Sequence, residues 1–159
     1  MSGLIRRATV SDIDAIHAIE IQSFSVPWSK ESFRSDLENT KVARYLVLEE
    51  EGEIIGYAGY WCIVGEGQVT NVAVAPLQRG KGYGLQLVQE MTARAFAEGC
   101  TTMFLEVRVS NEAALEVYTK LGYAKVSVRK DYYSEPTEDA YIMNCTPATY
   151  TGSYFTDKG

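Results

Sequence analysis

The sequence is poor in the residues on which several kinds of site depend. Its 159 residues include one histidine, His17, and three cysteines, Cys62, Cys100 and Cys145. The cysteines are odd in number and lack metal-ligand spacing, which argues against a disulfide framework and a zinc site. His17 falls inside an expected helix, and with no second histidine to choose, no Ser/His/Asp arrangement is favoured. We therefore expect no metal, and three reduced thiols in a reducing compartment.

The chain also lacks long apolar runs and an excess of basic residues. No apolar run approaches the roughly 20 residues that a membrane helix needs, and the first residues, MSGLIRRATVSD, lack the apolar stretch of a secretory signal. Lys and Arg number 15 against 21 Asp and Glu, a net charge of −6. Nucleic-acid binding needs a basic surface and is disfavoured, whereas an acidic surface suits a cationic partner such as a basic protein tail. We expect a cytoplasmic protein that binds neither membrane nor nucleic acid.

Apolar patterns of period two and period 3.6 alternate along the chain, which favours an α/β fold. One domain is expected over residues 1–146, followed by a polar tail over 147–159. Helices are expected over 13–22, 30–37, 85–99 and 111–121, the second capped by Ser29. Strands are expected over 4–7, 43–48, 54–64, 68–75, 103–108, 124–129 and 140–145.

A glycine-rich segment, Arg79-Gly80-Lys81-Gly82-Tyr83-Gly84, joins a strand to a helix. Glycines let the backbone approach a ligand and direct N–H groups toward it, and the free N–H groups and positive dipole end of a helix face the same point. Such a segment suits a phosphate or pyrophosphate. It lacks the full G-x-G-x-x-G fingerprint of dinucleotide-binding folds and the Gly-Lys-Ser/Thr of a P-loop. The alternative is a turn that merely reverses the chain.

The same segment resembles the R/Q-x-x-G-x-G/A signature of the GNAT acetyltransferases, and the strand before it is similar to the splayed fourth strand of that family. The resemblance implies the GNAT fold, a mixed central sheet flanked by helices, and acetyl-CoA as co-substrate. In such a fold the backbone of Val72, Ala73 and Val74 pairs with the pantetheine arm and holds the acetyl carbonyl. The phosphates would lie against Arg79, Gly80, Lys81, Gly82, Tyr83, Gly84 and Leu85.

The second half of the chain narrows the resemblance. The runs Leu105–Asn111, Tyr118–Tyr123, Arg129–Tyr133 and Glu138–Met143 closely resemble RimI-type enzymes, which acetylate protein N-termini, and Pro27-Trp28-Ser29 is similar to the same subgroup. The resemblance implies that Glu106 accepts a proton, that Tyr118 donates one to the departing thiolate, and that Asn111 hydrogen-bonds the cofactor arm. Trp28 and Tyr133 would lie in loops that border the peptide groove.

The chemistry of the acceptor bears on these roles. An α-amine with a pKa near 8 costs only about 1.4 kcal/mol to deprotonate at pH 7, against roughly 4–5 kcal/mol for a lysine side chain. A modest base suffices, but an ordinary glutamate would need a raised pKa or a bridging water. Other readings stay open: Glu106 as a strand carboxylate paired with Arg108, Tyr118 as a core aromatic packed with Leu115 and Leu121, and Asn111 as a helix cap.

The expected substrate is the N-terminal alanine of a small-subunit ribosomal protein, which is a basic protein, and the enzyme is expected to be a monomer or weak dimer. Two alternatives remain. One is a GNAT enzyme that acetylates a small-molecule amine or a lysine side chain, since the fold alone does not determine the substrate. The other is a non-catalytic protein that only binds acetyl-CoA.

Overall fold

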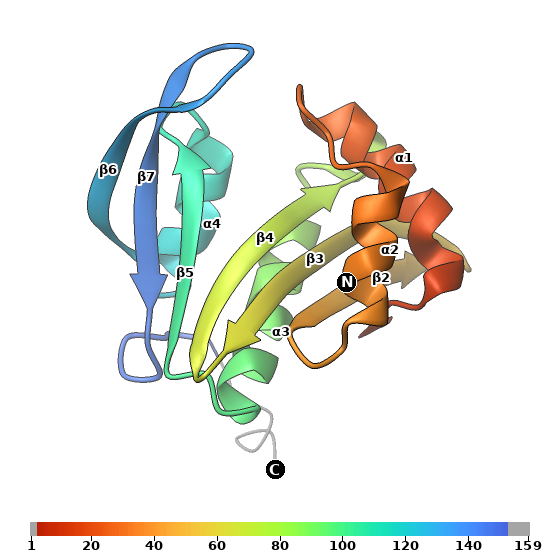
Figure 1. The fold of residues 1–159 in the computed structure, drawn as a ribbon, viewed down its shortest axis with the longest axis horizontal. Helices are drawn as coiled ribbons and strands as arrows, with labels where there is room; N and C mark the ends of the chain where they lie inside the picture. Colours follow the sequence, from red (N-terminus) through yellow and green to blue (C-terminus); the bar gives the residue numbers. More distant parts are fainter. Residues whose placement is uncertain (1–2, 153–159) are drawn as a thin grey trace.

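A seven-stranded mixed sheet runs through residues 3–152, the part of the chain that the computed structural model describes (Figure 1). The strand order is β1-β2-β3-β4-β5-β7-β6. The strands are β1 Leu4–Arg7, β2 Ala43–Glu50, β3 Glu53–Ile63, β4 Glu66–Val74, β5 Thr102–Arg108, β6 Ala124–Tyr133 and β7 Glu138–Cys145. The helices are α1 Ile13–Ser23, α2 Lys30–Glu38, α3 Tyr83–Ala97 and α4 Glu112–Lys120, with single 3₁₀ turns η1 Val10–Asp12 and η2 Pro76–Gln78.

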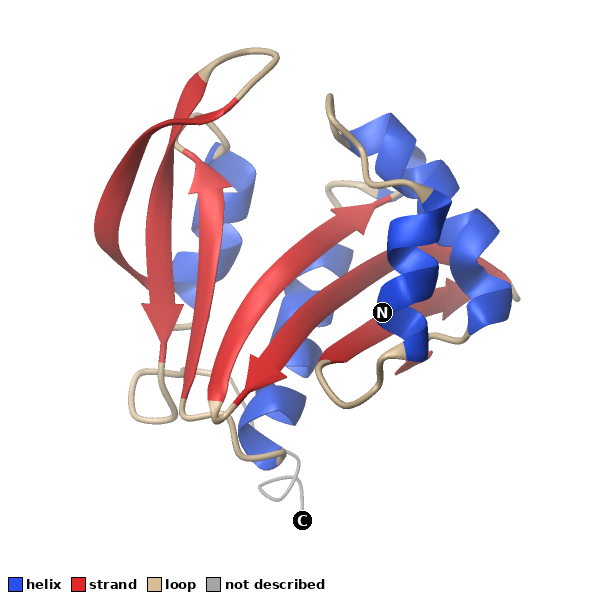
Figure 2. Cartoon of the chain, viewed as in Figure 1, coloured by secondary structure: helices blue, strands red, loops and turns tan. Residues whose placement is uncertain are grey.

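Helices cover both faces of the sheet (Figure 2). Helices α1 and α2 lie over β2, β3 and β4 on one face, and α3 and α4 lie on the opposite face. Strands β4 and β5 are parallel, whereas the other neighbouring strands are antiparallel. A parallel pair needs a crossover, and α3 supplies it. None of the helices in residues 3–152 is long and apolar enough to span a membrane.

Alternating side chains on the central strands fill two cores, one on each side of the sheet. On the α3 and α4 side, Met103, Leu105 and Val107 of β5 are buried together with Leu87 and Met91 of α3. On the α1 and α2 side, the core contains Ile16, Ile19, Phe33, Tyr45, Val47 and Tyr57. Because β5 buries every second residue, its intervening residues face the other side of the sheet. At β5, β7 and β6, no helix within residues 3–152 covers that side.

The predicted α/β architecture is confirmed, with differences at the ends of elements. Helix α3 begins at Tyr83, two residues before the expected start. Strand β6 continues to Tyr133 instead of ending at Arg129, because a register shift between these two residues lets the pairing with β7 resume at Tyr133 and Glu138. Tyr133 therefore ends a strand, and the prediction that it lies in a loop is wrong.

The first residues of the expected tail, 147–152, pack on the domain. Tyr150 is buried, its hydroxyl donates to the Gln89 carbonyl oxygen at 3.0 Å, and its ring packs edge-on against Phe96. The Thr151 amide donates to the Leu121 carbonyl oxygen at 3.0 Å. The tail positions 153–159 lie outside the described residues. Tyr150 contributes to the same core as α3.

Candidate active site

The parallel pairing of β4 with β5 is short, and the two strands diverge beyond it (Figure 1). Their register covers only Glu66 with Thr102, Gly67 with Met103, and Gln68 with Phe104. A register shift opposite Gly59 and Tyr60 of β3 bends β4 just past that point. From residue 69 to Val74, the edge of β4 that faces β5 is therefore not paired with that strand, and its backbone groups can bond an extended ligand.

The glycine-rich segment lies directly after β4 and carries the backbone that an anion site needs. Gly80 and Gly82 have φ angles of +78° and +87°, a left-handed conformation that favours glycine. Gly82 caps α3, whose first N–H groups have no partner within the helix. A side chain added at Gly84 would meet nothing within 4 Å, so the first turn is open. Pyrophosphate fits this dipole end, beside the exposed cation Lys81.

Three side chains of the segment bond protein groups, and one of them is Lys81, whose ammonium donates to Gln78 Oε1 at 3.2 Å. The Arg79 guanidinium donates to the Val74 carbonyl oxygen and to the Ser23 hydroxyl, both at 2.9 Å, and so joins the end of β4 to the end of α1. The Tyr83 ring is buried and its hydroxyl donates to the Glu50 carboxylate. The Tyr83 side chain is therefore occupied, and only the Tyr83 backbone is available to a ligand at the helix terminus.

Glu106 lies on β5, half-buried, on the face of the sheet that carries Gln68 of β4. The Gln68 amide donates to Glu106 Oε1 at 2.9 Å, at the point where the two strands separate. Desolvation raises the pKa of Glu106, opposed by the nearby Arg129 charge and by the Gln68 hydrogen bond. A raised pKa is the direction that a proton acceptor requires. Arg108 forms its ion pair with Glu138, at 3.1 Å, instead of with Glu106.

Tyr118 lies on α4, and burial raises its pKa to about 12. The phenol therefore stays protonated near neutral pH and can donate a proton. Its ring also packs against Tyr123, with centroids 5.5 Å apart, so core packing and a proton-donor role are compatible. At the start of the same helix, Asn111 Oδ1 accepts from the Ala114 amide at 3.1 Å, which confirms Asn111 as the helix cap.

Tyr133 interacts electrostatically with both candidate catalytic residues. Its ring lies under the Arg108 guanidinium, 4.4 Å from the centroid. Burial raises the pKa of Tyr133, and Tyr132, Glu106 and Tyr118 raise it further through their charges. Tyr133, on β6, therefore senses the charges of both Glu106 on β5 and Tyr118 on α4.

Trp28 lies in the connection between α1 and α2, on the β4 side of the point where β4 and β5 diverge. Its ring packs against Phe33 and Trp61, with centroid separations of 5.5 and 6.4 Å, so it contributes to the α1 and α2 core. Phe24 and Val26 of the same connection are exposed. In Figure 1 this connection and the β6–β7 turn stand at the same end of the sheet, the connection on the β4 side and the turn on the β5 side of the point where these strands diverge.

Sequence reasoning missed two polar residues of this region. The sequence pattern identifies Gln68 only as the start of a strand, because its contact with Glu106 depends on the pairing of β4 and β5, which no turn connects. Glu20 is 1% exposed and accepts a hydrogen bond from the Trp28 amide. The burial of Glu20 does have a signal in the sequence. Ile13, Ile16 and Glu20 follow the helical i, i+3, i+7 spacing, which places this carboxylate on the buried stripe of α1.

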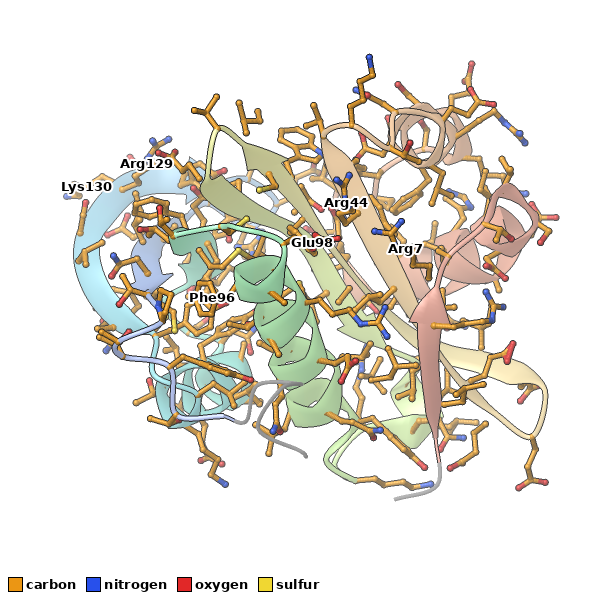
Figure 3. All side chains as sticks on the ribbon, turned by 90° about the horizontal axis from the view of Figure 1, so that it is seen from below. Arg7, Arg44, Phe96, Glu98, Arg129 and Lys130 are labelled. Atoms are coloured by element: carbon orange, nitrogen blue, oxygen red, sulfur yellow. The ribbon has the colours of Figure 1, made fainter. Side chains whose placement is uncertain are left out.

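A separate hollow of about 500 Å³ lies between β2 and the end of α3. Figure 3 shows Arg7, Arg44 and Glu98 gathered there, away from Arg129 and Lys130 on β6. Glu98 forms ion pairs with Arg7 at 3.1 Å and with Arg44 at 3.6 Å, so these charges are compensated locally. In the described part of the chain, no group of three or more His, Cys, Asp or Glu side chains could hold a metal ion.

Comparisons with known proteins agree with this geometry. The sequence model of the acetyltransferase (GNAT) family matches residues 13–123. A candidate ribosomal protein bS18-alanine N-acetyltransferase of Bacillus subtilis (strain 168) is 38% identical over 87% of this chain and 92% of that protein. The bS18-alanine N-acetyltransferase of Haemophilus influenzae is 34% identical over 89% of this chain and 97% of its own length.

Solved structures give the same result. The ribosomal-protein-S18-alanine N-acetyltransferase from Escherichia coli superposes with a TM-score of 0.84 at 27% identity, covering 95% of this chain and 96% of that chain. PaiA N-acetyltransferase from Thermoplasma acidophilum, in complex with coenzyme A, shares the fold with a TM-score of 0.75 at 17% identity, covering 92% and 99%. The chain therefore belongs to the GNAT acetyltransferase family, as an acetyl-CoA-dependent N-acetyltransferase of the RimI type.

Proposed function

We propose that this enzyme transfers the acetyl group of acetyl-CoA to the N-terminal α-amine of a small-subunit ribosomal protein that begins with alanine. The observation that carries the proposal is the match along nearly the whole chain to bS18-alanine N-acetyltransferases. The site supports it, because Glu106 and Tyr118 provide a half-buried carboxylate and a buried phenol beside the diverging strands.

The reaction needs one proton acceptor and one proton donor. The neutral amine attacks the thioester carbonyl, a C–N bond forms, and the C–S bond breaks. Glu106 takes the proton that the amine loses, directly or through water, and Tyr118 gives a proton to the departing CoA thiolate. Because the α-amine has a pKa near 8, its deprotonation at pH 7 costs only about 1.4 kcal/mol, which a carboxylate with a raised pKa can supply.

The cofactor would follow the free edge of β4 and the start of α3. In this proposal the backbone of Val72, Ala73 and Val74 holds the pantetheine arm and the acetyl carbonyl, and residues 80–85 hold the pyrophosphate through N–H groups. Asn111 would add a hydrogen bond to the arm while it caps α4. Arg79 would act by fixing the end of β4, since its guanidinium bonds the Val74 carbonyl oxygen.

The acceptor peptide would reach Glu106 between the α1–α2 connection and the β6–β7 turn, with Trp28 and Tyr133 on its two sides. A net charge of −6 attracts a basic chain. We place the reaction in the cytoplasm, where the ribosomal substrate is synthesised, and expect a monomer or weak dimer.

A peptide panel tests the proposal. Purified enzyme, acetyl-CoA and short peptides beginning with Ala, Ser, Met or Gly would be compared by CoA release, with mass identification of the product. An N-terminally blocked peptide that contains lysine, and a polyamine, serve as controls. Transfer to free N-termini, strongest on Ala, is expected. Transfer only to the lysine peptide or to the polyamine would overturn the N-terminal assignment, and binding of acetyl-CoA without any transfer would overturn the enzymatic one.

A further inference from the structure

A buried carboxylate joins the α1–α2 connection to the central strands. Glu20, on the last turns of α1, accepts from the Trp28 amide at 2.9 Å through Oε2. Asn71 Nδ2 of β4 lies 3.1 Å from each of its oxygens, and the Tyr57 hydroxyl of β3 donates to Oε1. The donors thus come from three different segments, and each carboxylate oxygen receives two of them.

The Glu20 carboxylate is the common acceptor for these donors. A carboxylate that is 1% exposed loses its hydration, and its hydrogen bonds must replace it. Replacing Glu20 alone by an apolar side chain would leave the Trp28 amide, the Asn71 amide and the Tyr57 hydroxyl without this acceptor, and an unsatisfied buried donor costs about 1–3 kcal/mol. What an apolar side chain cannot do is accept a hydrogen bond from a backbone amide, and this is the bond that holds Trp28 to α1.

The backbone at the other two donors is held without Glu20. Asn71 pairs with Gly59 of β3, and Tyr57 pairs with both Val47 and Ala73, so these residues stay in register within the sheet. Trp28 belongs to a connection between two helices, where no ladder fixes the chain. Loss of the carboxylate should therefore release this connection and leave the backbone of β4 in place.

We propose that Glu20 is a positioning residue for the acceptor peptide: by binding the Trp28 amide, it fixes the α1–α2 connection as one wall of the peptide groove. The inference rests on the proposed function, since that function places the peptide beside Trp28. It predicts that Glu20 affects the KM for the peptide and not the KM for acetyl-CoA, whose proposed contacts lie on β4 and α3.

Two substitutions at this position separate a hydrogen-bond role from a charge role. Glu20→Met removes the acceptor at similar volume, whereas Glu20→Gln keeps one oxygen for the Trp28 amide. We expect E20M to raise the KM for an N-terminal Ala peptide about tenfold, the size typical of one lost hydrogen bond to a charged group. E20Q should recover most of this effect, and the KM for acetyl-CoA should stay within about twofold in both. Glu38→Gln, on the exposed end of α2, is the matched control.

The outcomes are distinct. An unchanged peptide KM in E20M, or equal increases in both KM values, would overturn the inference, and so would an E20M chain that fails to fold. Hydrogen exchange of the native protein gives a second measurement that needs neither a variant nor activity. The Trp28 amide should exchange far more slowly than the amides of Ser25 and Val26, and equal rates would refute the anchor. If the wild type acetylates no N-terminal peptide, the proposed function fails, and the exchange result still decides whether Glu20 holds Trp28.

Discussion

Replacement of Glu106 by Gln isolates the negative charge of the proposed base. A glutamine oxygen can still accept from the Gln68 amide, which bonds Glu106 Oε1 at 2.9 Å, so shape and position are retained while the proton acceptor is lost. A positioned base contributes about 10²–10⁴-fold. The lower end applies here, because an α-amine with a pKa near 8 needs only about 1.4 kcal/mol at pH 7. We expect kcat at pH 7 to fall about 100-fold.

The assay is release of the CoA thiol with an N-terminal Ala peptide, measured from pH 6 to pH 9. The difference between wild type and E106Q should narrow as the pH rises through 8, because the peptide then supplies its neutral amine without help. Glu116→Gln, an exposed carboxylate on α4, is the control for a loss of charge. A folded E106Q that keeps more than half of the wild-type kcat at pH 7 would refute the role of Glu106 as base.

Three further predictions follow from other contacts. Tyr118→Phe keeps the buried ring and removes the proton donor, so kcat should fall at least about tenfold with little change in either KM, and full turnover would exclude this role. Gln68→Leu removes a hydrogen bond that lowers the pKa of Glu106, so the pKa of Glu106 should rise. Because the base must be ionised to act, the acidic limb of the pH–rate profile should move to higher pH. An acidic limb at the wild-type pH would contradict this prediction. Gly122 has a φ of +100°, and an added Cβ would collide with a backbone carbonyl oxygen; G122A should lose about 2–4 kcal/mol in urea unfolding, more than G52A, where φ is +80° and the space is open.

The order of elements could be predicted because it depends on local patterns. The alternation of Met103, Leu105 and Val107 with polar residues is a property of one segment, and the structure buries these three side chains as the pattern requires. The expected cap at Ser29 is confirmed, since its hydroxyl accepts from the Ser32 amide at 3.1 Å. The divergence of β4 from β5 has no such local signal, and its prediction rested on resemblance to a family.

The remaining features depend on contacts between distant segments. The sequence pattern predicts Tyr133 in a loop, and it cannot show the bulge that extends β6, because that bulge depends on pairing with β7. Tyr150 carried no pattern, since its burial depends on the groove beside α3 that it fills. Gln68 gains its importance from a neighbour 38 positions away. Glu20 is different, because its burial has a local signal in the helical spacing of α1 from which it could have been predicted.

The three register pairs between β4 and β5 also have a consequence for the energetics of cofactor binding. The sheet consists of two parts, β1–β4 and β5–β7, joined by this short ladder and by α3, which contacts β3, β4 and β5. In the proposed binding mode, acetyl-CoA would lie along the free edge of β4, complete this junction and bind only the folded chain. By thermodynamic linkage, acetyl-CoA at 100 times its Kd should add about 2.7 kcal/mol to the free energy of unfolding. The largest gain in amide protection should lie between residue 69 and Val74, so that cofactor binding itself supplies part of the cohesion of the sheet.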